Sequence, residues 1–173
     1  MDDAPIVRQL AGEHEIAVNC LCIPHPYEEG MAESWISTHP DTFDKGEFAC
    51  FAIELRAGQT LIGSISLTIN QEHEKAELVY WVGMPWWGKG YCTEAGRAII
   101  RYGFTVLGLN RIFAGHFSRN PASGRVMDKL GMTCEGYIRE HVKKWGNFED
   151  VKMYSILRRE YEEMSHGNHL LPL

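Results

Sequence analysis

The sequence predicts a mixed α/β domain whose helices and strands follow the order α-α-β-β-β-α-β-α-β-β. Three observations lead to this prediction. The 173 residues amount to about one domain of ordinary size. Apolar residues make up 45% of the chain and charged residues 23%, a balance typical of proteins with a buried core. The hydrophobic spacing alternates between the strand period and the helix period, and no repeat or linker divides it.

Two helices are expected before the first strand. Asp2 or Asp3 is placed to cap the first helix, which carries a proline in its opening turn and runs to about Gly12. A loop with two prolines follows, because proline disfavours regular pairing. The second helix is predicted over residues 27–37.

The middle of the chain predicts three strands followed by a helix. Apolar, β-rich runs cover residues 48–55, 60–69 and 76–82, and the first two runs form a hairpin. From about Tyr91 onward the apolar side chains recur at helical spacing, and Gly108 is suited to end that helix.

The last third predicts a strand over residues 111–117, a short helix over residues 120–130, and a closing hairpin that turns at Gly146-Asn147. Nothing in the composition divides the chain before this point. Residues 1–165 are therefore expected to form one domain. Residues 166–173 show no clear pattern and are expected to be a mobile tail.

The charge balance bears on the kind of partner. Lys and Arg number 17 and Asp and Glu 23, which gives a net charge of −6. The sequence has no basic stripe of the kind that binds nucleic acid, so no nucleic-acid partner is expected. An acidic body instead favours the approach of a cationic substrate such as an amine.

Cysteine usage and the apolar runs bear on location. The five cysteines show neither paired CxxC motifs nor zinc-ligand spacing, so we expect reduced thiols and no bound metal. No run of about 20 apolar residues occurs, so no membrane association is expected. The first residues lack the pattern of a signal peptide, and a cytoplasmic protein is predicted. Sheets of this size have edges to cover, and a homodimer is one arrangement that the sequence allows.

The most informative segment is a glycine-containing turn between the third strand and the following helix. The strand ends near Val82, the turn carries Gly88 and Gly90, and the helix begins near Tyr91. Such a turn presents free backbone N–H groups together with the positive end of a helix dipole. The turn therefore predicts a site for a phosphate or pyrophosphate.

On the residues alone, three interpretations of this turn stay open. Residues 83–89 match the GxxxxGK pattern of a P-loop, but Gly90 stands where Ser or Thr must hold magnesium. A dinucleotide fold needs a third glycine where the chain has Thr93, and an acid at a strand end about twenty residues on, which is missing. The third interpretation is a plain strand-to-helix turn with glycine caps.

Longer motifs accompany the turn. They are WGKGYCTEA (87–95), NPASGRVMDKLGMTCEG (120–136) and DVKMYSIL (150–157). In this order they resemble the GNAT superfamily of acetyltransferases, and more closely its branch of ribosomal-protein N-terminal (alanine) acetyltransferases. The resemblance spans about residues 60–158, more than half of the chain.

The chain departs from that branch at three places. Pro85 stands where the superfamily often has Gln or Arg, and Cys92 replaces a small alanine. The strand that usually precedes the first helix has no counterpart before Asp2-Asp3. The resemblance therefore implies a sheet that is one strand short, or an edge that is supplied differently.

The resemblance implies a fold and an activity. The expected fold is a single GNAT-like domain whose central, mostly antiparallel sheet is flanked by helices and splayed between strands 4 and 5 of the family order. The expected activity is direct transfer of an acetyl group from acetyl-CoA to a primary amine, at a protein N-terminus or in a small molecule, without a metal. The alternative is a non-catalytic acyl-CoA-binding sensor of the same fold.

The resemblance also implies catalytic roles for particular side chains. Ser123 is expected to donate a proton or a hydrogen bond to the leaving thiolate, with Asn120 beside it as a cofactor contact. Glu77 and His116 are the candidates for the base that deprotonates the amine, and Glu77 is the first choice.

The cofactor is expected along the end of the third strand and the turn. A backbone N–H near Trp81 or Val82 is expected to hold the oxyanion. Free backbone groups over residues 82–84 are expected to pair with the pantetheine, and the amides of the turn are expected to hold the pyrophosphate. The implied cofactor-binding residues are Trp81, Val82, Gly83, Met84, Gly88, Lys89, Gly90, Tyr91, Cys92, Thr93 and Asn120.

Overall fold

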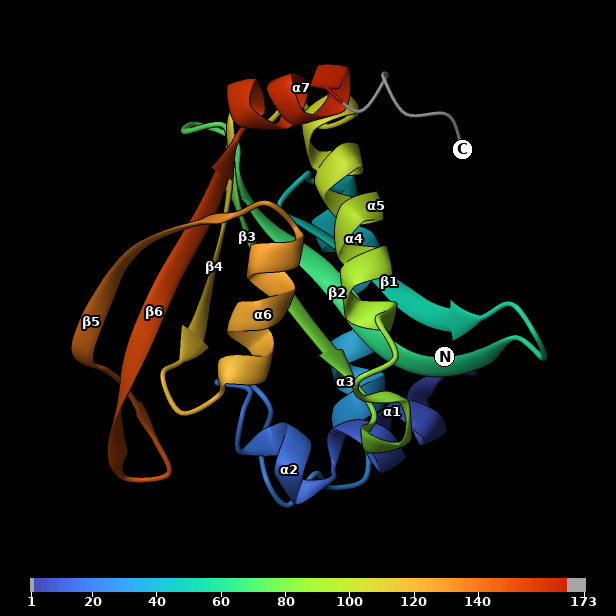
Figure 1. Cartoon of the computed structure of the whole chain (residues 1–173). Helices are drawn as coiled ribbons and strands as arrows, with labels where there is room; N and C mark the ends of the chain where they lie inside the picture. The colour runs from blue at the N-terminus through green and yellow to red at the C-terminus, as the bar shows by residue number, and fades with distance from the viewer. Residues whose placement is uncertain (1, 168–173) are drawn as a thin grey trace.

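A six-stranded sheet forms the centre of the protein over residues 2–167, the part of the chain that the computed structural model describes (Figure 1). The strands lie in the order β1-β2-β3-β4-β6-β5. They are β1 (Phe48–Leu55), β2 (Thr60–Asn70), β3 (Lys75–Val82), β4 (Arg111–Phe117), β5 (Thr133–Lys144) and β6 (Asn147–Leu157).

Helices cover both faces of this sheet (Figure 1). α5 and α6 pack on one face, and α1, α3 and α4 lie on the other. α7 follows β6 and packs beside α5 at the end of the sheet. The helices are α1 (Ala4–Ala11), α2 (His14–Ala17), α3 (Met31–Ser37), α4 (His39–Asp44), α5 (Tyr91–Thr105), α6 (Pro121–Lys129) and α7 (Arg158–Gly167).

The sheet consists of two antiparallel blocks joined by one short parallel contact. β1, β2 and β3 pair antiparallel, and so do β4, β6 and β5. β3 and β4 run parallel and pair only at residues 75–77 against residues 111–113. Beyond these three pairs the two strands diverge. The structure thus confirms the expected mostly antiparallel sheet that is splayed between its two central strands.

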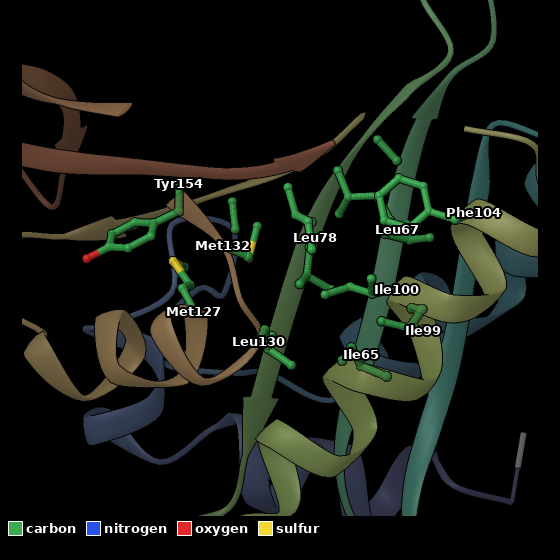
Figure 2. Packing of buried hydrophobic residues seen from close by; sticks show 14 of the residues in the cluster. Ile65, Leu67, Leu78, Ile99, Ile100, Phe104, Met127, Leu130, Met132 and Tyr154 are labelled. Carbon is green, nitrogen blue, oxygen red and sulfur yellow. The ribbon is translucent and has the colours of Figure 1, made fainter. Parts of the chain in front are cut away.

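Two hydrophobic clusters hold the helices to the two faces. The larger cluster joins β2, β3, β4 and β6 to α5 and α6, and Figure 2 shows its side chains meeting between sheet and helices. α5 and α6 approach closely at Gly96, where an added Cβ would lie 2.7 Å from the Leu130 side chain. The smaller cluster joins α1 and α3 to Leu61 of β2 and Trp81 of β3.

A β-bulge in β2 shifts which residues of that strand face each cluster. The register between β1 and β2 skips Ile62. Leu61 faces α1 and its neighbour Ile62 faces α5, and the bulge then allows Ile65, an odd number of residues further on, to face α5 as well. Gly63, which follows Ile62, has no space for a side chain, because an added Cβ would lie 2.2 Å from the backbone oxygen of Trp81.

The predicted strands agree with the structure to within two residues, whereas the helices agree less well. The second helix begins at Met31, four residues later than predicted. α2 and α4 were not predicted because segments of four and six residues are too short for a 3.6-residue period to show. α7 was not predicted because it is mostly polar. Its last residue is Gly167, so residues 166 and 167 of the predicted tail are helical, and residues 168–173 lie outside the described part of the chain.

Two local expectations were wrong. Asp3 occupies the N-cap of α1, but its side chain makes no capping hydrogen bond. The closing hairpin turns at Trp145-Gly146, one residue earlier than predicted, with positive φ angles of 48° and 88°. A two-residue turn of this type requires positive φ at both central residues, which explains the glycine at the second position.

The crowding at Gly63 predicts a large loss of stability for Gly63→Ala. The added Cβ would collide with backbone of β3 that cannot move without breaking the sheet, so we expect the free energy of unfolding to fall by about 2–3 kcal/mol. Gly136→Ala in β5 is the matched control, because its Cβ would meet nothing within 4 Å. Urea denaturation of both variants measures the difference; equal stabilities would contradict the prediction.

Candidate functional site

A cleft of about 1120 Å³ opens where β3 and β4 diverge. One wall is formed by the segment from α1 to α3, and the other by α6 and the turn before α5. Successive side chains of β3 point to opposite faces of the sheet, so Glu77 and Trp81 lie toward α1, whereas Leu78 and Tyr80 lie toward α5 and α6. All four residues line the cleft. The cleft therefore passes through the sheet from one face to the other.

The open edge of β3 carries backbone groups that face this cleft. The amide of Gly83 donates to β2 over 2.8 Å, so the odd-numbered residues of β3 direct their backbone groups toward β2. The even-numbered residues Leu78, Tyr80 and Val82 then face β4, from which they have already separated. The Val82 carbonyl accepts a hydrogen bond from the Trp87 indole at 2.6 Å, and the register leaves the Val82 N–H without a strand partner in the described part of the chain.

The structure limits which of residues 81–84 present open backbone groups to the cleft. The Trp81 amide faces β2, so Val82 and not Trp81 presents an open N–H. Gly83 and Met84 do not line the cleft. Their amides are also engaged, that of Gly83 with β2 and that of Met84 with a carboxylate oxygen of Glu13 at 3.5 Å. The open backbone groups therefore begin earlier along β3 than the sequence indicated.

The turn before α5 forms an open cradle of amides. Gly88 and Gly90 have φ angles of +73° and +87°, and an added Cβ on either residue would meet nothing within 4 Å. Within the described structure, the amides of Tyr91 and Cys92 have no hydrogen-bond partner. The Thr93 amide is already bonded to the Gly90 carbonyl at 2.9 Å and is not available. Free amides at the N-terminus of a fifteen-residue helix fit an anion such as a pyrophosphate.

The first turn of α6 contributes the second set of polar groups. Asn120 is the N-cap, and its side-chain oxygen accepts a hydrogen bond from the Ser123 amide at 3.4 Å. The Ser123 hydroxyl lies 2.8 Å from the hydroxyl of Tyr80. Asn120, Ser123 and Tyr80 all line the cleft. Tyr80 was not predicted from the sequence, although strand alternation places it on the same face as Leu78 and was the signal available to find it.

The two candidate bases lie on opposite faces of the sheet. Glu77 is on the α1 side, and burial raises the pKa of its carboxyl group. His116 lies under α6, where an added Cβ on Gly124 would be 2.8 Å from its Nε2 atom. The His116 Nδ1 atom donates to the Phe117 carbonyl over 2.8 Å, and Nε2 is buried without a partner among the described residues. Glu77 is therefore the candidate that reaches the open α1 side of the cleft.

Two of the thiols that line the cleft are held in their neutral form. Burial raises the pKa of Cys92 to about 12 and that of Cys20 to about 11. The thiolate is the nucleophilic form of cysteine, so these two side chains are poor nucleophiles at neutral pH.

Charged side chains of opposite sign line opposite walls of the cleft. The carboxylates come from the α1 side and from β3, and they are Glu15, Glu29 and Glu77. The cations come from α6, and they are Arg125 and Lys129. Lys89 of the turn, which the sequence placed in the cofactor site, is exposed and does not line the cleft.

Two cations hold the loop over residues 18–23, which walls the α1 side of the cleft. Lys144 of β5 donates to three loop carbonyls, at 2.7 Å to Cys20, 3.2 Å to Leu21 and 2.6 Å to Ile23. Arg119 donates to the Val18 carbonyl at 2.6 Å, while Glu149 binds its Nε atom. Few backbone hydrogen bonds anchor this loop, so these side chains define its position.

The described residues 2–167 contain neither a metal-binding cluster nor a membrane-spanning helix. No three or more His, Cys, Asp or Glu side chains gather there in a way that suits a metal ion. None of the helices in that part of the chain is long and apolar enough to cross a membrane.

Comparison with known proteins yields both relatives and a family match. Residues 1–133 match the family model described as an acetyltransferase (GNAT) domain. An uncharacterised N-acetyltransferase, p20, of Bacillus licheniformis is 33% identical over 162 residues, which cover 93% of this chain and 90% of that protein. A putative ribosomal N-acetyltransferase, YdaF, of Bacillus subtilis is 38% identical over 104 residues, covering 60% of this chain and 57% of that protein.

A solved structure has the same fold. The spermidine N-acetyltransferase of Vibrio cholerae, in complex with CoA and spermine, superposes with a TM-score of 0.80 over 93% of both chains. Its sequence is 24% identical to this one. At that level of identity the likeness concerns the fold.

The clamp on the loop predicts that Lys144→Met opens residues 18–23. The variant keeps the apolar stem but leaves three carbonyls without their charged donor, so we expect thermolysin to cut at Leu21 roughly tenfold faster than in the wild type. Lys143→Met is the control, because Lys143 is exposed and lies over Phe148 instead. Mass spectrometry identifies the fragments; equal cleavage of the two variants would contradict the clamp.

Proposed function

The chain belongs to the GNAT acetyltransferase family, and we propose that it transfers the acetyl group of acetyl-CoA directly to a primary amine. The amine is either the N-terminus of a protein or a small amine. The observation that carries this proposal is the cleft that crosses the sheet between β3 and β4. It has an anion cradle and cations on one side and carboxylates on the other.

The cofactor end is the turn before α5 together with α6. The open amides of Tyr91 and Cys92 are suited to the pyrophosphate, and Gly88 and Gly90 let it approach the backbone. Asn120 lies on the same side of the cleft and supplies a polar side chain. These groups fit the phosphates of acetyl-CoA, the acetyl donor of the family.

The open edge of β3 extends this site into the sheet. The backbone groups of Leu78 and Tyr80 have no partner on β4 and are suited to the amides of the pantetheine arm. The open N–H of Val82 serves as the donor to the acetyl carbonyl oxygen as negative charge develops there. A donor that is fixed in advance by the sheet needs no reorganisation during the reaction.

The chemistry at the reacting carbon divides between the two faces of the sheet. Glu77 takes a proton from the attacking amine on the α1 side. Ser123 donates a hydrogen bond to the leaving sulfur on the α6 side. Because Cys20 and Cys92 remain protonated, they offer no competing nucleophile, which supports direct attack by the amine without an acyl-enzyme.

The acceptor side of the cleft favours a cationic molecule. Three carboxylates line that side, and amines are protonated at neutral pH before they bind. A protein N-terminus is our first choice, because the Bacillus subtilis relative is described as a putative ribosomal N-acetyltransferase. A panel of peptides that begin with alanine or serine, tested beside spermidine, distinguishes a protein N-terminus from a small amine.

The anion cradle predicts that acetyl-CoA stabilises the protein and that Gly90→Ala weakens this stabilisation. A ligand at about 100 times its Kd adds about 2.7 kcal/mol, which raises the melting temperature by several degrees. Alanine at Gly90 is strained at positive φ and projects into the open cradle, so we expect the affinity to fall by about tenfold or more. Gly58→Ala is the control, because Gly58 has a similar φ of +84° in a distant hairpin.

ATP with magnesium and NAD, run in parallel in the same thermal melts, test the other two nucleotide interpretations of the turn. Stabilisation of the wild type by ATP or NAD but not by acetyl-CoA would overturn the proposed function.

The proposed base predicts a pH dependence. Because burial raises the pKa of Glu77 and only the carboxylate accepts a proton, kcat/KM should rise with pH through an apparent pKa above the ordinary range of a glutamate. Glu77→Gln should lose this limb and fall on the order of a hundredfold at neutral pH. Glu54→Gln, an exposed change in β1, serves as the control. An unchanged acidic limb in Glu77→Gln would assign the base to another group.

A further inference from the structure

Tyr80 lies at the middle of the open stretch of β3 and reaches across the splay to α6. Its hydroxyl is 2.8 Å from the Ser123 Oγ atom and donates to the Ser123 carbonyl oxygen over 3.1 Å. Leu78 and Val82 flank it on the same face, and all three have backbone groups that face the opening. Any group that occupies the cleft beside Ser123 therefore also lies beside this pair of hydroxyls.

The proton count of the pair restricts how Ser123 is oriented. A phenol has one proton to donate and accepts with its oxygen. While the Tyr80 proton is directed to the Ser123 carbonyl, the short contact between the two hydroxyls is made by the serine proton, which points toward Tyr80. In that state Ser123 has no proton to offer to the cleft.

A rotation of the two hydroxyls reverses this arrangement without moving a heavy atom. Tyr80 then donates to the Ser123 Oγ atom, and the serine proton is free to turn toward the cleft. Hydrogen bonds in such a chain polarise one another, so a donor behind Ser123 makes its own proton a stronger donor. Burial raises the pKa of Tyr80, which keeps the phenol protonated in this role at neutral pH.

We propose that Tyr80 is a positioning residue for the acetyl transfer, which directs the Ser123 hydroxyl and polarises it toward the leaving sulfur. This inference rests on the proposed function. The amine nitrogen forms the bond to the acetyl carbon, and the carbon–sulfur bond breaks with its electron pair going to sulfur. Ser123 donates a hydrogen bond to that sulfur while Tyr80 donates to Ser123. The proton that the amine loses balances the one that the thiolate finally gains, and both hydroxyls end neutral.

The test compares Tyr80→Phe, Ser123→Ala and the double variant. Each removes only a hydroxyl, so the packing across the splay is retained. We expect each single change to lower kcat by about tenfold or more, with the KM for acetyl-CoA within about twofold of the wild type. The double variant should be no slower than Ser123→Ala, because the two groups act in series. Ser123→Thr, which keeps the hydroxyl, should retain most of the activity.

Tyr102→Phe is the matched control, because Tyr102 packs on Phe51 away from the cleft and loses the same atom. Three results would overturn the proposal: a wild-type kcat in Tyr80→Phe, losses that multiply in the double variant, or a loss confined to acetyl-CoA affinity. The last result would make Tyr80 a structural tie between β3 and α6.

A second readout separates this inference from the proposed function. Hydrolysis of acetyl-CoA in the absence of amine requires the same departure of sulfur, and so it responds to Tyr80→Phe whatever the acceptor is. If the wild type hydrolyses acetyl-CoA but acetylates no amine of the panel, the proposed acceptor fails and the role of Tyr80 is still decided by the hydrolysis rates. If the wild type neither binds nor hydrolyses acetyl-CoA, both proposals fall.

Discussion

The early divergence of β3 from β4 is the constraint on which the rest of the site depends. The two strands share three residue pairs, whereas each is tied to its outer neighbour by seven or more. The two antiparallel blocks therefore twist independently. α6 packs between the two blocks through Met127 and the adjacent Leu130. The backbone groups that a continuous sheet would have consumed are left open at the cleft. The N-termini of α5 and α6 both lie toward that same end (Figure 1).

The cleft is held open by contacts that lie outside it. Arg119 and Lys144 both use their cationic groups on loop carbonyls instead of on carboxylates of the cleft. A loop without a backbone ladder is rigid only if side chains satisfy its carbonyls, and a buried ammonium that donates to three of them does this strongly. The hairpin of β5 and β6, far from the glycine turn in sequence, thereby fixes the α1 side of the cleft.

Much of the fold followed from the sequence because strand patterning and glycine positions are local signals. The strands were predicted to within two residues, and the turn at Gly88 and Gly90 was found from its spacing alone. The site was harder to predict because hydrogen-bond direction along a strand depends on register. Nothing in the order of residues says that Trp81 faces β2 while Val82 faces the opening. The contact between Tyr80 and Ser123 joins residues 43 positions apart and needs three-dimensional information.

In the proposed reaction, the sheet separates the groups that would hold the anionic donor from those that would hold the cationic acceptor. Glu77 lies on one face and Ser123 lies behind the other, so a carboxylate and the developing thiolate do not share one face. A carboxylate placed beside the leaving sulfur would oppose the growth of negative charge there, and a cation beside the amine would oppose its binding. The proposed direct transfer through the opening in the sheet avoids both conflicts, because each charge would develop next to groups that stabilise it.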